Sequence, residues 1–184
     1  MRTLKLAMYV SLDGVVEDPA WTAPFWNDEL SDMQEEYLYS SDALVLGRVT
    51  YEGFAASWPG MEEQTGEFGR KMNSMPKHVA SLTMREAEWN ASIIEGDLAA
   101  EIAKLKDEPG GDLLIYGSGD LVDELTRLRL IDEYRFMVYP IVVGTGKRLF
   151  STGPEATLEL IGTATTATGV VVATYRLPAE EGAV

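Results

Sequence analysis

Several residues of this chain could bind an anion, and the first group follows an apolar run that is typical of a strand. In the segment Leu46-Gly47-Arg48-Val49-Thr50, glycine permits a close approach, and a guanidinium and a hydroxyl follow it. If a helix begins here, its free amides, its dipole and the forked Arg48 side chain together suit a phosphate. A tight turn with a solvated arginine would account for the same residues equally well.

A second glycine-bearing turn, Tyr116-Gly117-Ser118-Gly119-Asp120, also joins an apolar run to a predicted helix. It is similar to a dinucleotide-binding fingerprint, although Val122 stands where G-x-G-x-x-G requires its third glycine. The alternative interpretation is a helix cap, in which Ser118 or Asp120 accepts amide hydrogen bonds.

Two other kinds of catalytic motif are not present. The segment Gly144-Thr145-Gly146-Lys147-Arg148 is not a P-loop, because Ile141 takes the place of the first glycine and Arg148 that of the Ser/Thr. A Ser–His pair would have to use His78, which lies in a predicted strand, and Gly117-Ser118-Gly119 is not the G-x-S-x-G elbow of serine hydrolases.

Two carboxylates are candidate catalytic residues, because a positioned acid can deliver a proton to a substrate. Asp13 follows the first predicted strand, and Asp32 lies in an acidic segment with helical spacing. Most acids in such a segment form a solvated helix face. Trp21, Phe25 and Trp26 are candidates to wall a pocket for a planar ligand, or they form a packed surface loop.

The elements that must position these residues alternate between strand and helix patterns. A hairpin is predicted at the end of the chain, where Leu158–Thr168 and Val170–Leu177 flank Thr168-Gly169. This order predicts an α/β fold with a mainly parallel sheet and an antiparallel edge, in which ligands bind at the carboxyl ends of the strands. We expect the other strands near Lys5–Ser11, Ala43–Leu46, His78–Ser81, Ile93–Ile94, Leu113–Tyr116 and Glu133–Tyr139, and helices near Asn27–Ser40, Thr50–Ser57, Glu67–Met72, Leu98–Lys106 and Asp120–Leu128.

Composition limits the classes of function. The 184 residues, 46% of them hydrophobic, predict one compact domain over residues 1–184. A net charge of −15 disfavours binding to nucleic acid and to anionic membranes. The absence of cysteine and the single histidine exclude thiolate catalysis and Cys-based or multi-histidine metal sites, so we expect no metal. No signal-peptide or membrane-spanning pattern is present, and we expect a cytoplasmic protein.

Four blocks of the sequence, taken together and in order, resemble the dihydrofolate reductase-like superfamily. The chain is most similar to the reductase domain of the bifunctional riboflavin-biosynthesis deaminase–reductase and to its stand-alone relatives. The blocks are Lys5–Val16 (KLAMYVSLDGVV), Asp42–Glu52 (DALVLGRVTYE), Pro76–Thr83 (PKHVASLT) and Gly111–Phe150, which contains YGSGDLVDEL and PIVVGTGKRLF.

The resemblance implies an eight-stranded mixed sheet flanked by helices, and NADPH as the cofactor. It places Gly47, Arg48, Val49 and Thr50 at the adenosine-side phosphates, with Arg48 near the 2′-phosphate. It further implies that the adenine ribose is flanked by Ser81, Leu82 and Thr83. The nicotinamide would be bordered by Val16 and Tyr116. The turn against the pyrophosphate would consist of Gly117, Ser118, Gly119, Asp120 and Leu121.

The sequence departs from the superfamily pattern where folate reductases place a carboxylate on their first helix. Ser31 occupies that position, and Asp32 is one residue away. No deaminase zinc motif is present, and Lys147-Arg148 is the one candidate for binding a substrate phosphate. We therefore expect a reductase that transfers a hydride from NADPH to a small planar heterocycle, pyrimidine- or pterin-like, or to a carbonyl compound. The alternative is a non-catalytic nucleotide-binding or interaction protein that keeps the fold.

The last two predicted strands also suggest how the chain assembles. Between Leu158 and Leu177, Glu159 and Arg176 are the charged side chains. Such a neutral, β-prone edge must be shielded from pairing with other chains. Stand-alone members of the superfamily are commonly homodimers, so the resemblance implies a homodimer that buries this region, and the alternative is that the hairpin only completes the chain's own sheet.

Overall fold

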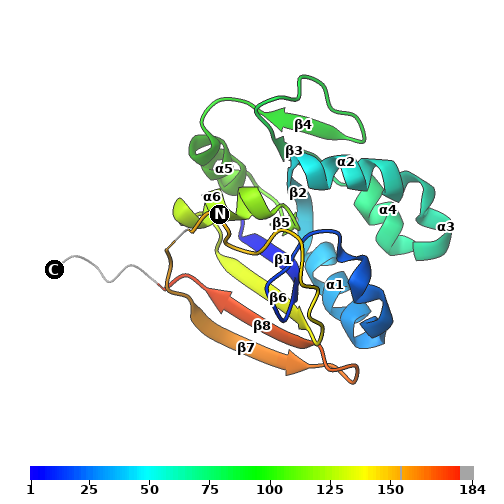
Figure 1. The fold of residues 1–184 in the computed structure, drawn as a ribbon. Coiled ribbons are helices and arrows are strands. Elements are labelled where there is room, and N and C mark those ends of the chain that lie inside the picture. Colours follow the sequence, from blue (N-terminus) through cyan, green and yellow to red (C-terminus); the bar gives the residue numbers. More distant parts are fainter. Residues whose placement is uncertain (154, 179–184) are drawn as a thin grey trace.

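The computed structural model describes residues 1–153 and 155–178, and these form one eight-stranded sheet with helices on both faces (Figure 1). The order of the strands across the sheet is β4-β3-β2-β5-β1-β6-β8-β7. The strands are β1 (Leu4–Ser11), β2 (Ser41–Gly47), β3 (Lys77–Ala80), β4 (Ala91–Ile94), β5 (Asp112–Tyr116), β6 (Glu133–Tyr139), β7 (Glu159–Thr165) and β8 (Val171–Arg176).

The helices connect these strands in the order that the sequence pattern predicts. Two short 3-10 helices, η1 (Pro19–Phe25) and η2 (Trp58–Gly60), lie in loops. The α-helices are α1 (Asp28–Ser40), α2 (Arg48–Ser57), α3 (Glu62–Thr65), α4 (Glu67–Ser74), α5 (Leu98–Asp107) and α6 (Gly119–Arg127).

The strand directions confirm the predicted fold class. From β4 to β6 every neighbouring pair is parallel. β8 pairs antiparallel with both β6 and β7, which is the predicted C-terminal hairpin. The first six strands in the sheet order therefore end at the same edge of the sheet, where ligands bind in open α/β sheets.

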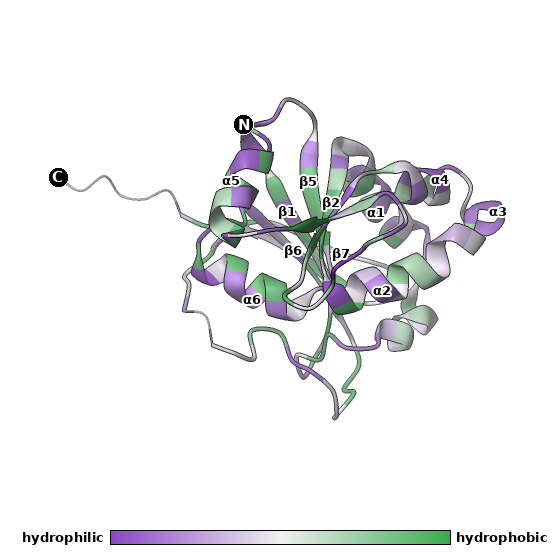
Figure 2. Ribbon diagram, turned by 90° about the horizontal axis from the view of Figure 1, so that it is seen from above, coloured by the Kyte–Doolittle hydropathy of each residue, from purple (hydrophilic) through white to green (hydrophobic). Residues whose placement is uncertain are grey.

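Two apolar layers hold the helices against the sheet. One face is covered by α5 and α6, which bury Ile102, Val122 and Leu125, and the other by α1, α2 and α4, which bury Leu30 and Met72 among others. Figure 2 shows the hydrophobic strands in the middle of the molecule and the hydrophilic outer faces of the helices. These five helices are amphipathic because only one face of each meets the sheet.

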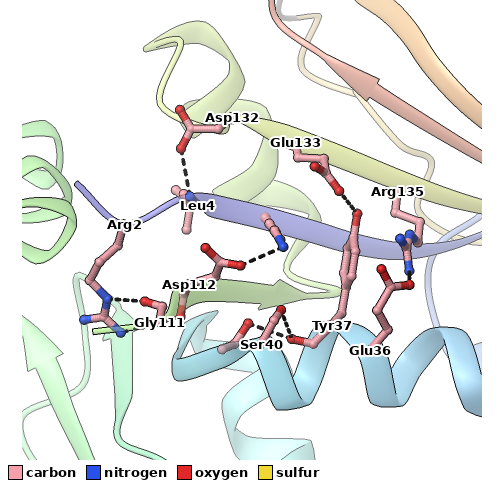
Figure 3. A network of polar contacts seen from close by, with 12 residues as sticks. Arg2, Leu4, Glu36, Tyr37, Ser40, Gly111, Asp112, Asp132, Glu133 and Arg135 are labelled. Carbon is pink, nitrogen blue, oxygen red and sulfur yellow. Dashed lines mark hydrogen bonds and ion pairs between the residues drawn. The ribbon is translucent and has the colours of Figure 1, made fainter. Parts of the chain in front are cut away.

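A charged network fixes α1 on the sheet (Figure 3). The Tyr37 hydroxyl donates a hydrogen bond to the Glu133 carboxylate. The guanidinium of Arg135 lies 3.5 Å from the centre of the Tyr37 ring, and it donates to Glu36 at 3.2 Å. It also donates to the Met33 carbonyl at 3.1 Å. The position of α1 relative to β6 is therefore set by side-chain bonds as well as by burial.

The described residues contain neither a membrane-spanning helix nor a cluster of metal ligands. None of the helices in this part of the chain is long and apolar enough to cross a bilayer. Over the same residues, no three His, Asp or Glu side chains are grouped so that they could hold a metal ion.

Candidate functional site

The two glycine-bearing turns lie side by side because β2 and β5, which precede them, are hydrogen-bonded neighbours. The Gly47 amide donates to the Ser118 hydroxyl at 2.9 Å, and the Ser118 amide donates to the Thr50 hydroxyl at 3.0 Å. Each turn thus supplies a hydroxyl that accepts a backbone hydrogen bond from the other turn. The start of α2 and the start of α6 form one surface.

Neither helix start has a side-chain cap. Gly47 is the N-cap of α2, and Ser118, the N-cap of α6, makes no side-chain capping bond. Ser118 has a left-handed backbone, φ 62°, and its hydroxyl instead donates to the Tyr116 carbonyl at 2.9 Å. The cap interpretation for Ser118 is therefore wrong. The first amides of both helices carry partial positive charge and can bind an anion.

The backbone of the second turn is open to a close approach. Gly117 has φ +53°, a conformation that side chains with a Cβ rarely adopt. A Cβ added to Gly119 would lie 3.7 Å from Val16 Cγ2 and 4.0 Å from Lys147 Cε, which is ordinary contact. Val16 therefore lies beside this turn, while Leu121 packs into the core beneath Gly47.

The segment Ser81-Leu82-Thr83 follows β3, whose last residue, Ala80, pairs with Gly47. The Ser81 hydroxyl accepts from the amides of Thr83 and Met84 at 3.2 and 3.0 Å. Leu82 is 95% exposed. The structure thus brings this segment to the edge of the sheet that carries the two glycine turns.

Arg48 and Lys147, beside the two glycine turns, each have a carboxylate partner. Arg48 forms an ion pair with Glu52 at 3.0 Å, and both side chains are about half exposed. Lys147 pairs with Asp120, the acid in the first turn of α6. A ligand phosphate must therefore share or replace these carboxylates.

Asp13 holds two loops together, and its geometry does not suit the predicted role of proton donor. Its carboxylate accepts from the Ser11 hydroxyl at 2.7 Å and from the amides of Val143 and Gly144 at 3.0 and 2.8 Å. Arg148 forms an ion pair with it at 3.5 Å. The Ser11 hydrogen bond, followed by those of the amides, holds the pKa of Asp13 well below its usual range, so it carries no proton at neutral pH. The ion pair with Asp13 also holds the Arg148 side chain against the loop that follows β1.

Asp32 is also misplaced for the predicted role. It is exposed on the solvent face of α1, while Ser31 is partly buried. α1 directs the polar side chain of Gln34 into the protein, where it is 3% exposed. Gln34 is not among the site residues predicted from the sequence. Its spacing from Leu30 and Tyr37 is the signal that could have placed it on the buried face.

Gln34 belongs to a buried polar cluster with three tyrosines. Its amide nitrogen donates to the Tyr9 hydroxyl at 2.6 Å. Burial raises the pKa of Tyr9 well above its usual value, and Tyr116 and Tyr139 raise it further. Among the described residues, no hydrogen-bond partner meets the Gln34 oxygen or the hydroxyls of Tyr116 and Tyr139. We call these four residues the tyrosine–glutamine cluster.

The predicted aromatic segment packs on this cluster. The rings of Trp21 and Phe25 lie 5.6 and 6.0 Å from the Tyr139 ring, and Trp26 lies 6.1 Å from Tyr9. η1 and the adjoining Trp26 therefore pack on Tyr139 and Tyr9. His78, by contrast, lies within β3 with its Nδ1 3.3 Å from the Ser92 hydroxyl, next to the edge strand β4.

Comparisons with known proteins agree with this geometry. The family model for the RibD C-terminal domain matches residues 2–172. The uncharacterized protein YyaP of Bacillus subtilis is 30% identical over 178 residues, covering 95% of this chain and 94% of that protein. A candidate riboflavin biosynthesis protein from Shewanella sp. PV-4 has a similar structure, with a TM-score of 0.77, 24% identity, and coverage of 97% of this chain and 100% of the other.

A dihydrofolate reductase from Enterococcus faecalis, solved with NADP(H), also shares the fold. Its TM-score is 0.64 at 18% identity, with 95% of this chain and 96% of that chain covered. The eight-stranded sheet with its antiparallel hairpin is thus the dihydrofolate reductase-like fold. Because the family model spans most of the residues, the chain belongs to the RibD C-terminal domain family.

Proposed function

We propose that this protein is an NADPH-dependent reductase of a small planar substrate, either a pyrimidine- or pterin-like heterocycle or a carbonyl compound. The observation that carries the proposal is the pair of uncapped helix starts at the ends of β2 and β5. Two adjacent sets of free amides, with Arg48 beside them, suit a ligand that carries more than one phosphate.

The residues at this edge fit the parts of NADPH. In the proposal, Gly47, Arg48, Val49 and Thr50 bind the adenosine-side phosphates, and Ser81, Leu82 and Thr83 flank the ribose. Gly117, Ser118, Gly119, Asp120 and Leu121 form the turn for the diphosphate, while Val16 and Tyr116 border the nicotinamide. The position of Gly119 supports this placement, because an added Cβ there would lie against Val16, which borders the proposed nicotinamide site. A bound dihydronicotinamide supplies a hydride.

The substrate would lie on the other side of Tyr116, against β1 and β6. Tyr116 pairs with Ala7 of β1, and Tyr139 is at the end of β6. The rings of Tyr9, Tyr139, Trp21 and Phe25 form edge-to-face contacts there. Aromatic walls of this kind suit a flat ligand. Asp13 and Asp32 have no place in this arrangement, and we assign the proton delivery to neither.

Two measurements test the proposal. The purified protein is titrated with NADPH and with NADH, and its binding is followed by cofactor fluorescence. Oxidation of NADPH is then followed by absorbance in the presence of pterins, flavin precursors, quinones and aldehydes. Saturable NADPH binding and oxidation with at least one of these compounds are expected. No binding of NADPH would reject the proposal. Binding without oxidation across all four classes would favour a non-catalytic nucleotide-binding protein.

A further inference from the structure

The sheet has a free edge at β4, at the opposite end of the strand order from β7 (Figure 1). Among the described residues, β4 pairs only with β3, and the two strands are parallel. The Lys77 amide donates to the carbonyl of Asn90, the residue before its register partner Ala91, at 3.0 Å. In a parallel ladder this pattern turns the backbone groups of Ala91, and two residues later those of Ile93, away from β3. The N–H and C=O of Ile93 therefore face outward.

An open cavity lies on each side of β4. The first has a volume of about 440 Å³, lies between the strand and α5, and is lined in part by Ser92, Ile94 and Leu105. The second, of about 290 Å³, lies beside the loop that precedes β4, where Ala87 and Ala91 line it. Ile94 packs on the core layer of α5 and α6, and Ala91 on that of α2 and α4, so the two cavities flank opposite faces of the strand. We call them the α5 cavity and the loop cavity.

The α5 cavity is acidic. Glu95, Glu101 and Glu108 line it together with a single lysine, Lys104. Lys104 is already paired with Glu101 at 2.8 Å, and Arg2 approaches Glu108 at 3.8 Å. The carboxylates outnumber these two cations, and the whole chain carries a net charge of −15. The cavity therefore favours a cationic side chain over a neutral or acidic one.

We propose that β4 is a docking edge for an extended peptide segment of another protein, which adds to the sheet as a further strand and places lysine or arginine side chains in the α5 cavity. The peptide backbone bonds to the outward N–H and C=O of Ile93. Because successive side chains of a strand point to opposite faces, every second side chain enters the α5 cavity and the others face the loop cavity. This inference does not depend on the proposed function.

The length and charge of the edge favour such a segment over a second copy of this chain. β4 has four residues, Ala91–Ile94, and a short edge strand of this kind resists pairing with the same edge of another copy. None of the four is basic, and each copy would bring its own net charge of −15 to the contact. A short basic segment instead has the charge that the α5 cavity lacks.

The first test uses a synthetic peptide as the probe. It has lysine at the second, fourth and sixth of its seven positions, valine or threonine between them, and a fluorescent label. Fluorescence anisotropy with the full-length protein at physiological salt is expected to show saturable binding. Two further peptides carry N-methyl groups, one on the lysine amides and the other on the amides between them.

The methylated peptides separate strand pairing from simple charge attraction. Both keep the charge of the parent peptide, but only one of the two sets of amides can face β4 in a strand pairing. One methylated peptide should therefore bind at least about tenfold more weakly than the other, since it loses several hydrogen bonds. Equal binding of the two, or no saturable binding of the parent peptide, would overturn the proposal.

The second test changes the charge of the α5 cavity. Glu95→Lys should weaken the parent peptide at least about fivefold, because it replaces an attraction by a repulsion beside the docking edge. Glu63→Lys is the matched control, since it makes the same change in net charge at an exposed position of α3. Equal losses for the two variants would show that the peptide responds only to the net charge, and the proposed site would be wrong.

The third test removes the outward donor of the protein. Ile93→Pro lacks that N–H but keeps the bonds to β3, so it should retain the wild-type circular dichroism spectrum and bind the peptide at least about tenfold more weakly. Ser92→Pro, which removes an N–H that faces β3, should instead lower the melting temperature. Unchanged peptide binding by Ile93→Pro would contradict the proposal, and the methylated peptides decide the question on the wild-type protein if this variant unfolds. A wild-type dimer that dissociates on Ile93→Pro would assign the edge to a second copy and reject the peptide.

Discussion

Arg48 is the residue on which the choice between NADPH and NADH depends in the proposed site. It stands at the first position of α2, beside the free amides, and its partner Glu52 is one turn further along the same helix. An exposed ion pair of this kind contributes little to stability, so the guanidinium is free to exchange Glu52 for a phosphate at small cost. The residue is therefore suited to binding a 2′-phosphate and not needed for folding.

The first prediction concerns cofactor choice. Arg48→Ala should weaken NADPH by about 1.5–3 kcal/mol, roughly 10- to 150-fold, because it removes a charge-assisted bond to the 2′-phosphate. The affinity for NADH, which lacks that phosphate, should change much less. Fluorescence titration of both cofactors measures the difference. Glu52→Gln is the control, since it leaves Arg48 in place and should not weaken NADPH. Equal losses for the two cofactors would contradict the assignment.

The second prediction concerns Gly119. Its added Cβ would meet only Val16 and Lys147 at ordinary distances, so Gly119→Val should fold with an unchanged circular dichroism spectrum. The larger side chain would occupy the space assigned to the diphosphate and abolish NADPH binding. Gly53→Val, at an open position in α2, is the matched control and should bind NADPH normally. Retained binding by the Gly119 variant would show that the turn serves only to begin α6.

At the scale of elements, the loop after β1 and the loop after β6 act as one unit. Val15 and Arg148 form an antiparallel bridge, and the Val16 amide donates to the Lys147 carbonyl at 2.9 Å. The Asp13 carboxylate adds the bonds to Val143 and Gly144. Together these contacts set the position of Val16 beside the second glycine turn. Asp13 thus positions the site although it touches no proposed ligand.

The third prediction follows from the lowered pKa of Asp13. Because the folded-state pKa lies below the unfolded one, the ionised carboxylate stabilises the fold above pH of about 4 and loses this effect as the pH falls further. Asp13→Asn should therefore lower the melting temperature at neutral pH, and its difference from wild type should shrink below pH of about 4. Asp32→Asn, which removes an equal charge from the exposed face of α1, should leave the melting temperature unchanged. A difference for Asp13→Asn that does not depend on pH would contradict this account.

At the scale of the whole molecule, β7 is an unprotected edge. All seven of its residues are exposed, including Leu160 at 53% and Ile161 at 44%, and Val171 on β8 is 42% exposed. Among the described residues, no strand pairs with the outer side of β7, because β7 ends the sheet order. An apolar edge of this kind favours pairing with another chain. The predicted homodimer would bury this edge.

The fourth prediction is that the protein is a homodimer joined through β7 and the exposed side of β8. Light scattering at micromolar concentration should give twice the chain mass of 20.2 kDa. Val171→Lys or Ile161→Lys should convert the dimer to a monomer, whereas Leu128→Lys, at the 39% exposed C-cap of α6, should not. Val172→Lys is unsuitable as a test because Val172 is 4% exposed and packs in the core. A wild-type mass of 20.2 kDa would reject the dimer.

The sequence by itself determined the elements and the two glycine turns. The helical spacing near Asn27–Ser40 and the Thr168-Gly169 turn are local patterns, and they predicted α1 and the C-terminal hairpin correctly. That both turns lie at one edge of the sheet also followed from the sequence, because parallel strands end at the same edge. Their adjacency did not, since only the structure shows that β2 and β5 are neighbours. Periodicity and turn signals extend over only a few neighbouring residues, so they can be recognised in the sequence without knowledge of the fold.

Only the tertiary structure decided what the polar side chains face. Asp13 was a plausible proton donor until the fold placed the Val143 and Gly144 amides, 130 and 131 residues away, on its carboxylate. Gln34 lies in the predicted helix α1, but its hydrogen-bond partner Tyr9 lies in β1. The pKa and the hydrogen-bonding state of a side chain depend on groups within a few ångströms, and folding brings those groups from distant parts of the chain. No local pattern specifies them, and for that reason the fold was predictable and the substrate side of the site was not.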